Sequence, residues 1–313
     1  MKKEIAYIGL GKMGKNMVLR LLEHGWRVHV FDTDQTAVRE VVKMGARHLA
    51  SLQEISRLPK PRLVWVMVPA FVPASAGKPA GKPVDDVLFG RSGLTSILKK
   101  GDVVIDGGNS FFEDTLRRAK KVQAKKIEFM DIGTSGGPRG ARNGACLMIG
   151  GDKKLFIRLK PLFEDLAAPH AYAHCGKAGS GHFVKMIHNG IEYGMMQAIA
   201  EGFNLMKHSS FKPNLKAVAE LYNHKSVVES RLIGWLKEGF DIYGENLQAI
   251  SGTVGATGEG EWTVKTAKKM KLPVPIIEGS YIFRLQSKKN PSYAGKVLSV
   301  MRHQFGGHEA KRK

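Results

Sequence analysis

Short β-branched runs alternate with helical patterns along the first half of this chain, and this alternation limits the possible folds more than any other feature. The strand-like runs are IAYIGL, RVHVFD, LVWVMVP, DVVIDGG, IEFMDIG and GACLMIGG. Stretches such as MGKNMVLRLLEHG and EDTLRRAKKVQAKK predict helices between them. Strands that alternate with helices are typical of a parallel sheet covered on both faces. We therefore predict an α/β fold with a doubly wound parallel sheet in this half.

The pattern changes after Gly176, where long helical stretches with few strand signals begin. The glycine-rich sequence HCGKAGSG lies at the change and is typical of a linker. We predict a sheet domain over residues 1–177 and an all-helical domain over 178–313. The tetrapeptide AGKP occurs twice, at Ala76–Pro79 and Ala80–Pro83, and is interpreted as a tolerated surface insertion.

The first predicted strand is joined to the first predicted helix by a glycine-rich loop, Gly9-Leu10-Gly11-Lys12-Met13-Gly14. This loop has the pattern G-x-G-x-x-G in a strand–turn–helix context, which is typical of Rossmann-type dinucleotide binding. The first glycine allows the tight turn, the second lets the backbone approach a pyrophosphate, and the third lets helix and strand pack closely.

The second predicted strand ends in Asp32, where an acidic residue would accept a hydrogen bond from the adenosine ribose. A carboxylate can accept from a free 2′-hydroxyl but would repel a 2′-phosphate. Asp34 adds a second negative charge, and the turn contains no arginine. We therefore predict that the cofactor is NAD rather than NADP.

The formal net charge of +21 suits an acidic substrate or an anionic surface. The basic residues are spread along the chain without a nucleic-acid-binding motif, so we expect no nucleic-acid partner. No apolar run reaches the roughly 18 to 20 residues of a membrane span, and we expect no membrane association. Two cysteines, Cys146 and Cys175, provide no disulfide framework and fit the cytoplasm.

The stretch VKMIHNGIEYG predicts a helix with two unlike faces. At about 100° per residue, one sector holds four chemically different polar groups, Lys185, His188, Asn189 and Glu192. The opposite sector holds Phe183, Ile187, Gly190, Ile191 and Gly194, and its glycines would let another helix approach. The polar sector is either a solvated face or a catalytic group whose lysine and glutamate address opposite ends of one small molecule.

Two more glycine-rich turns follow predicted strands, at Asp106-Gly107-Gly108-Asn109-Ser110 and at Ser135-Gly136-Gly137. Ligands of open parallel sheets bind beyond the carboxyl ends of the strands. Small residues at these turns would let a substrate approach the backbone, although each could also be a plain turn.

Taken in order, these motifs resemble the 6-phosphogluconate dehydrogenase (decarboxylating) family of the β-hydroxyacid dehydrogenases. The segments that carry the resemblance are GLGKMG, MVPA, KPVDDV, IDGGNS, SGG-x-x-GAR-x-G, GHFVKMIHNGIEYG and R-x-x-FGGH. The length of the chain resembles the shorter, NAD-preferring form, and Asp32-Thr33-Asp34 stands where NADP-using members have Asn-Arg-Thr.

The resemblance implies oxidation of a 3-hydroxy acid, loss of carbon dioxide, and protonation of the enol to a ketose phosphate, in the pentose phosphate pathway or gluconate utilisation. Lys185 would take the hydroxyl proton, Glu192 would protonate the enol carbon, and Asn189 and His188 would hold the hydroxyls. No metal is expected, because the lysine ammonium would stabilise the developing oxyanion.

The resemblance also implies further contacts. Substrate binding would involve Asn109, Ser135, Gly136, Gly137, His188, Tyr193, Arg284, Arg302 and His308. The cofactor would contact Val68, Pro69, Ala70 and Asn109 besides the glycine-rich loop. In this family the C-terminal tail reaches the neighbouring subunit, so we expect a homodimer or homotetramer.

Two departures leave alternatives open. Glu261 stands where the family has a basic residue, and Pro138-Arg139 replaces two glutamates. An acidic residue at position 261 would not bind phosphate. The alternatives are another β-hydroxyacid dehydrogenase that acts on a smaller or unphosphorylated acid, and an NAD-binding protein without turnover.

Overall fold

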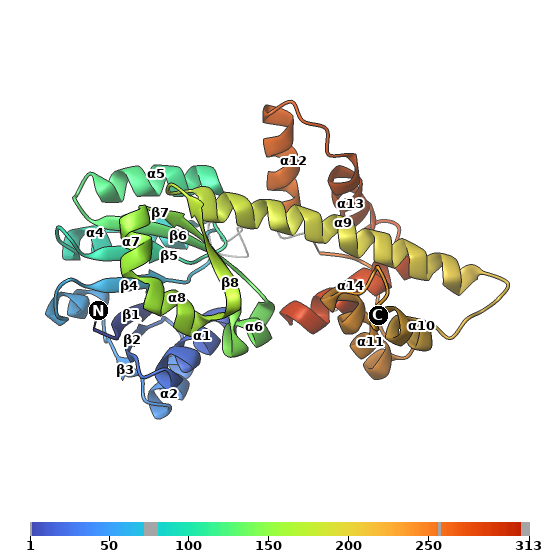
Figure 1. Cartoon of the computed structure of the whole chain (residues 1–313), viewed down its shortest axis with the longest axis horizontal. Coiled ribbons are helices and arrows are strands. Elements are labelled where there is room, and N and C mark those ends of the chain that lie inside the picture. Colours follow the sequence, from blue (N-terminus) through green and yellow to red (C-terminus); the bar gives the residue numbers. More distant parts are fainter. Residues whose placement is uncertain (1, 72–80, 256–257, 308–313) are drawn as a thin grey trace. The chain divides into compact units, whose positions relative to one another are not determined.

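The computed structural model describes residues 2–71, 81–255 and 258–307 of the 313-residue chain, and it divides into two compact units, Met1–Lys185 and Met186–Lys313. The division falls inside one long helix, α9 (Ser180–His208), which is yellow in Figure 1. The AGKP repeat lies largely outside the described residues. Within the described ranges no helix is long and apolar enough to cross a bilayer.

The first unit is built on one eight-stranded sheet in the order β3-β2-β1-β4-β5-β6-β7-β8. Its strands are β1 (Glu4–Ile8), β2 (Arg27–Phe31), β3 (Arg47–His48), β4 (Leu63–Val66), β5 (Val103–Asp106), β6 (Glu128–Ser135), β7 (Ala145–Gly151) and β8 (Ala167–Gly176). The order of the first six strands is that of the dinucleotide-binding Rossmann fold, with the change of direction between β1 and β4. All six strands predicted from sequence are present, and the predicted fold class is confirmed.

The strands differ from the prediction of a parallel sheet in the direction of one strand and in their number. Strand β7 pairs antiparallel with β6, and β8 follows β7 in parallel. Only residues 136–144 connect β6 to β7, which is too short for a parallel crossover of about a dozen residues. Strands β3 and β8 were not predicted. Strand β3 has only two residues, and the β8 sequence AAPHAYAHCG has a proline near its start, a glycine at its end and little β-branched character.

Helices cover both faces of this sheet. They are α1 (Lys12–Glu23), α2 (Gln35–Lys43), the 3-10 helix η1 (Leu52–Arg57), α3 (Pro83–Phe89), α4 (Leu94–Ile97), α5 (Phe112–Gln123), α6 (Gly137–Asn143), α7 (Lys153–Arg158) and α8 (Lys160–Leu166). Alternate residues of β1 belong to different cores: Ile5 and Tyr7 pack with α1, α2 and α8, and Ala6 and Ile8 pack with α3, α4 and α5. The two cores explain the continuously apolar strands, since both faces of the sheet are buried.

The second unit is all-helical, as predicted. It contains the rest of α9 and α10 (Leu215–Tyr222), α11 (Arg231–Tyr243), α12 (Glu259–Lys269), α13 (Pro275–Gln286) and α14 (Tyr293–Gly306). Its core joins Met196 and Phe203 of α9 to Phe240 of α11 and Leu298 of α14. Helices α11 and α14 approach closely at Gly239, where an added Cβ would lie 1.9 Å from a methyl carbon of Val300.

Candidate active site

The glycine-rich loop follows β1, and the surroundings of its three glycines are compatible with the motif. Gly9 adopts φ +100°, and a Cβ there would lie 2.4 Å from the carbonyl oxygen of Met67. A Cβ on Gly14 would lie 2.1 Å from the carbonyl oxygen of Gly9, so α1 can pack on the loop only without a side chain. Gly11 faces open space, with nothing within 4 Å of an added Cβ. The two outer glycines are required by packing, and the middle one leaves room for a ligand to approach the backbone.

Asp32 lies directly after β2 and faces this loop. Its carboxylate accepts hydrogen bonds from the backbone N–H of Leu10 at 2.5 Å and of Asp34 at 2.8 Å. The side chain therefore ties the end of β2 to the glycine-rich loop. It lies where an acidic residue of this fold accepts from a ribose hydroxyl.

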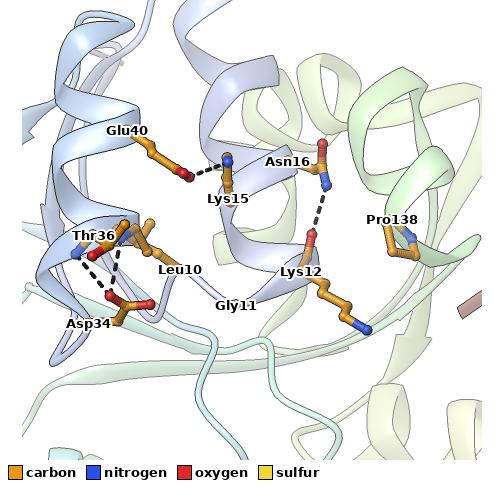
Figure 2. Close-up of a pocket in the computed structure, with 10 residues that line it drawn as sticks. Leu10, Gly11, Lys12, Lys15, Asn16, Asp34, Thr36, Glu40 and Pro138 are labelled. Carbon is orange, nitrogen blue, oxygen red and sulfur yellow. Dashed lines mark hydrogen bonds and ion pairs between the residues drawn. The ribbon is translucent and has the colours of Figure 1, made fainter. Parts of the chain in front are cut away.

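A cavity of about 460 Å³ opens beside the loop, between the start of α1 and α2 (Figure 2). Its lining residues are Leu10, Gly11, Lys12, Lys15, Asn16, Asp34, Thr36, Ala37, Glu40 and Pro138. The Lys15 ammonium pairs with the Glu40 carboxylate across the cavity, and Asp34 accepts from the N–H groups of Thr36 and Ala37 at the start of α2. Four of these lining residues were not predicted from the sequence: Lys15, Asn16, Thr36 and Glu40. Lys15 and Asn16 could have been predicted, because they lie about one helical turn after Gly11 and so on the same side of the helix.

The predicted cofactor contacts Val68, Pro69 and Ala70 lie in the loop after β4, next to the loop after β5. Strands β4 and β5 pair so that Val66 lies opposite Asp106, and both loops leave the same edge of the sheet. A Cβ on Gly107 would lie 2.2 Å from Nε1 of Trp65, and one on Gly108 would lie 2.8 Å from the carbonyl oxygen of Val68. These two glycines are therefore required by packing between the loops.

A buried ion-pair network holds the loop that presents Asn109. The Arg118 guanidinium donates to Oδ2 of Asp106 at 3.2 Å and to the hydroxyl of Ser110 at 2.8 Å. It also donates to Oδ1 of Asp85 on α3 at 3.2 Å. Asn109 itself is exposed at the tip of this loop. The network was not predicted, because Arg118 looks like one more surface residue in the basic pattern of α5.

The predicted Ser135-Gly136-Gly137 turn joins β6 to α6. Gly136 and Gly137 adopt φ +123° and +62°, a region that other residues rarely adopt. Pro138, the next residue, reaches the cavity beside the glycine-rich loop. The turn is therefore next to the proposed nucleotide site, and Pro138 is compatible with it as the second residue of α6.

Lys185, His188, Asn189 and Glu192 all lie on α9, as predicted. His188 Nδ1 lies 3.1 Å from Oδ1 of Asn189 and 3.8 Å from Oε2 of Glu192. Lys185 and Glu192 are seven residues apart, which is about 10 Å along the axis at 1.5 Å per residue. The helix is continuous over this stretch, so these side chains are held in a fixed order along one axis.

The helix–helix contacts expected at Gly190 and Gly194 are confirmed, but the predicted faces of α9 are partly wrong. A Cβ on Gly190 would lie 2.7 Å from Cγ2 of Thr263 on α12, and one on Gly194 would lie 3.2 Å from Cγ2 of Ile276 on α13. Ile191, however, is 52% exposed, whereas Asn189 is only 9% exposed. The buried sector follows the packing partners rather than the hydrophobic pattern, and it is centred nearer Gly190 and Tyr193.

A buried cluster in the helical unit contains the two arginines predicted to bind substrate. Arg284 is 1% exposed, and its guanidinium carbon lies 3.3 Å from the ring centroid of Tyr193. Burial, with a smaller contribution from the positive charge of Arg302, lowers the pKa of Arg284 to about 10, although the neighbouring Tyr193, Glu192 and Glu259 act to raise that pKa. Burial also lowers the pKa of Arg302, whose Nη1 lies 2.8 Å from the place a Cβ on Gly255 would occupy. Arg302 lies on α14 and is therefore buried within the helical unit of its own chain.

The two acidic residues at the start of α12 have different surroundings. Glu261, which replaces the family's basic residue, pairs with Lys265 at 2.6 Å on the surface. Glu259 is buried and contributes its charge to the arginine cluster. The position of Glu261 was singled out in the sequence, whereas the role of Glu259 was not predicted. His308 lies outside the described residues, and those that are described contain no group of three or more His, Cys, Asp or Glu side chains suited to a metal.

The sheet order, the glycine-rich loop and the acidic residue after β2 define a dinucleotide-binding protein of the dehydrogenase class. Comparison with protein families identifies the family. Residues 4–179 match the NAD-binding domain of 6-phosphogluconate dehydrogenase, and residues 181–311 match the C-terminal domain of the same enzyme. The chain belongs to the 6-phosphogluconate dehydrogenase family, and it is an oxidoreductase by this membership.

Two relatives match along their whole length. The Bacillus subtilis protein YqeC, which carries a provisional assignment as a 6-phosphogluconate dehydrogenase, is 41% identical over 99% of this chain and 100% of its own. A Haloferax volcanii protein named as an NAD(+)-dependent, decarboxylating 6-phosphogluconate dehydrogenase is 37% identical over 99% of both chains. The Candida albicans enzyme is 35% identical over 90% of this chain but only 54% of its own, so this chain resembles the shorter relatives in length.

Solved structures support the same fold. The Plasmodium falciparum 6-phosphogluconate dehydrogenase, whose structures include complexes with NADP+ and with 6-phosphogluconate, superposes with a TM-score of 0.76 at 27% identity over 95% of this chain and 70% of its own. A 3-hydroxyisobutyrate dehydrogenase from Salmonella typhimurium has a TM-score of 0.74 at 20% identity over 95% of this chain and 99% of its own, which is a likeness of fold.

Proposed function

We propose that the protein oxidises and decarboxylates 6-phosphogluconate to ribulose 5-phosphate and carbon dioxide with NAD, as in the pentose phosphate pathway or gluconate utilisation. The observation that carries this proposal is that Lys185, Asn189 and Glu192 lie on one uninterrupted helix in a chain of this family. A protein that only binds NAD has no use for a proton acceptor and a proton donor in this arrangement.

In the proposed reaction, Lys185 removes the proton of the C3 hydroxyl and then donates a hydrogen bond to the resulting carbonyl oxygen. Bound NAD supplies the acceptor for the hydride that leaves C3. The carboxylate then leaves as carbon dioxide, because the C3 carbonyl can take the electrons of the broken bond as an enol. Glu192 gives a proton to the enol carbon, and Asn189 and His188 hold the hydroxyl groups.

The residues around the glycine-rich loop fit a dinucleotide without a 2′-phosphate. Gly11 leaves open space for the pyrophosphate, and Asp32 is placed to accept from a ribose hydroxyl. In the cavity lining, Asp34 and Glu40 offset the positive charges of Lys12 and Lys15, and Glu40 pairs with Lys15, which would otherwise be available to a phosphate. These charges support NAD over NADP, as does the similarity to the Haloferax volcanii relative, which is named as NAD(+)-dependent.

The buried arginine cluster supports a phosphorylated substrate. Arg284 and Arg302 are both buried, and a planar guanidinium with several donors is well suited to phosphate. Glu261 pairs with Lys265, which offsets the negative charge that would otherwise oppose a phosphate. Arg284 also lies over the ring of Tyr193. Tyr193 is the residue after Glu192, the proposed proton donor, on α9.

The charge balance of the same cluster favours a second candidate. Glu192 and Glu259 both raise the pKa of each arginine, so two carboxylates offset two guanidinium groups. A cluster with little net positive charge suits an unphosphorylated sugar acid better than a phosphate dianion. The second candidate is therefore a β-hydroxyacid dehydrogenase for a smaller or unphosphorylated acid.

One experiment separates these functions. Rates of nicotinamide reduction are measured with 6-phosphogluconate and with gluconate, each with NAD and with NADP, and carbon dioxide and ribulose 5-phosphate are measured as products. We expect the highest kcat/KM for 6-phosphogluconate with NAD, with carbon dioxide formed in equal amount. Preference for gluconate would support the second candidate, and NAD binding without turnover would contradict both.

We also propose a homo-oligomer, in which the C-terminal tail reaches a neighbouring subunit. Along α9, Val184, Ile191, Met195 and Leu205 are exposed apolar residues, and at about 100° per residue they fall within one narrow sector. An exposed apolar stripe of this kind is typical of a protein–protein interface. Light scattering after size-exclusion chromatography tests this, and we expect Ile191→Lys to lower the measured mass.

A further inference from the structure

The first turn of α9 packs on strands β6 and β7 through three glycines and one carboxylate, and these residues have no role in the reaction described above. Gly133 and Asp131 are on β6, Gly150 is on β7, and Gly181 is in α9 itself. We call these four residues the α9 seat. All of them, and Lys185, belong to the unit formed by residues 1–185.

Asp131 is fully buried and caps α9 from a strand far earlier in the sequence. Its Oδ1 accepts from the backbone N–H of Gly179 at 2.6 Å, and its Oδ2 accepts from the backbone N–H of His182 at 2.9 Å. The N-terminal N–H groups of a helix lack partners within the helix and carry partial positive charge. A buried carboxylate at this end therefore fixes where the helix starts relative to β6.

The glycines of the seat allow the backbone of α9 to lie directly on the strands. A Cβ on Gly181 would lie 2.5 Å from the carbonyl oxygens of both Asp131 and Met148. A Cβ on Gly150 would lie 2.7 Å from the backbone nitrogen of Gly181. Neither position can carry a side chain without moving the helix away from the sheet.

Gly133 touches Lys185 directly. A Cβ on Gly133 would lie 2.3 Å from Cβ of Lys185 and 2.9 Å from its Cγ, so the base of the lysine side chain rests on the Gly133 backbone. The other side of the helix start is held by α5. His182 Nδ1 lies 2.8 Å from Oγ1 of Thr115, and the Phe183 ring packs edge-on against Phe112 with centroids 5.2 Å apart. The helix can neither slide nor rotate here without breaking one of these contacts.

We propose that Asp131 and Gly133 are positioning residues that set the place of the Lys185 side chain, and therefore the rate of proton removal from the substrate. This inference rests on the proposed function, in which Lys185 is the base. A displacement of about 1 Å in a reacting group can reduce the rate about a hundredfold. The α9 seat thus acts on the rate of the chemical step, whereas the binding of NAD depends on the glycine-rich loop.

The test compares Gly133→Ala with a matched glycine variant, Gly93→Ala. A Cβ on Gly93 would lie 2.8 Å from the carbonyl oxygen of Leu88, so this variant introduces a similar clash in the same unit without touching Lys185. For Gly133→Ala we expect kcat to fall about 10- to 100-fold with an unchanged Kd for NAD. For Gly93→Ala we expect a lower Tm and an unchanged kcat.

A deuterium isotope effect distinguishes positioning from a loss of folded protein. With 6-phosphogluconate deuterated at C3, a misplaced base makes the chemical step slower and more rate-limiting, so the isotope effect on kcat should increase in Gly133→Ala. A smaller fraction of folded enzyme lowers kcat and leaves the isotope effect unchanged. A Gly133→Ala enzyme with wild-type kcat, or with an unchanged isotope effect, would overturn the inference.

Asp131→Asn provides a second route if Gly133→Ala does not fold. The amide keeps the shape of the side chain but loses the charge and one acceptor, so the first turn of α9 loosens, and we expect a smaller kcat with a larger isotope effect. A wild-type kcat in Asp131→Asn would contradict the role of the α9 seat. Failure of the proposed function is recognised separately, because the wild-type protein would then not turn over 6-phosphogluconate, or Lys185→Met would retain activity.

Discussion

The glycine-rich loop after β1 and the middle of α9 use glycine for different reasons. In the loop, Gly14 is fixed by its contacts with Gly9 and Tyr7 of the same strand–turn–helix unit, and Gly9 is also fixed by Met67, directly after the neighbouring strand β4. In α9, Gly190 and Gly194 are fixed by Thr263 and Ile276, more than 70 residues later. The first site is a local structure whose function follows from its motif. The second becomes a site only when distant helices pack on it.

The variant with the largest expected effect tests whether the catalytic residues lie on α9 while the glycine-rich loop only binds the cofactor. Lys185→Met removes the proposed base and should lower kcat about 10²- to 10⁴-fold, the usual contribution of a general base, while the Kd for NAD stays unchanged. Stopped-flow or steady-state rates and a fluorescence titration with NAD measure the two quantities. Substantial residual turnover would mean that the base is another residue.

A pair of loop variants separates glycines required by packing from those required by a ligand. Gly14→Ala should lower the free energy of unfolding by about 1–3 kcal/mol, because its Cβ would overlap the carbonyl oxygen of Gly9. Gly11→Ala should change that free energy by less than about 0.5 kcal/mol, because its Cβ meets open space, but it should weaken NAD binding. Denaturant unfolding and NAD titration of both variants provide the measurement. Equal destabilisation by the two would remove the distinction.

The choice of cofactor should change when the charge after β2 is removed. Asp32→Asn should lower the ratio of kcat/KM for NAD to that for NADP by about tenfold, which corresponds to about 1.4 kcal/mol. The ratio is the proper measure, because Asp32 also holds the N–H groups of Leu10 and Asp34 and its loss should weaken both cofactors. Asp34→Asn is the control, with a smaller expected change. A ratio unaffected by Asp32→Asn would refute the electrostatic argument for NAD.

The smallest expected effect concerns the arginine cluster of the helical unit. The pKa of Arg284 is lowered to about 10, so its guanidinium is charged below that pH and loses its proton as the pH rises through it. Anion binding should therefore weaken in the alkaline range, and kcat/KM for 6-phosphogluconate should fall several-fold above pH about 10 while the Kd for NAD changes less. A kcat/KM that stays constant through this range would argue against Arg284 as a substrate ligand.

The nucleotide site was predictable because its determinants are close together in the sequence. A strand, three glycines, a helix and an acidic residue at the end of the next strand fix the backbone and the charge of the loop. The six strands were predictable for a related reason, since burial on both faces makes them continuously apolar. Strand β8 was missed, because only its pairing with β7 makes AAPHAYAHCG a strand.

The sequence by itself determined the Rossmann sheet, the glycine-rich loop, and the polar residues along α9. Only the tertiary structure decided which sector of α9 is buried, and it did so through the contacts of Gly190 with Thr263 and of Gly133 with Lys185. The same is true of Glu259, Arg284 and Arg302, which form one electrostatic cluster although they lie on three different helices. The physical reason is that backbone propensity and hydrophobic periodicity act over a few residues. Burial, charge interaction and steric exclusion act between any two residues that the fold brings together.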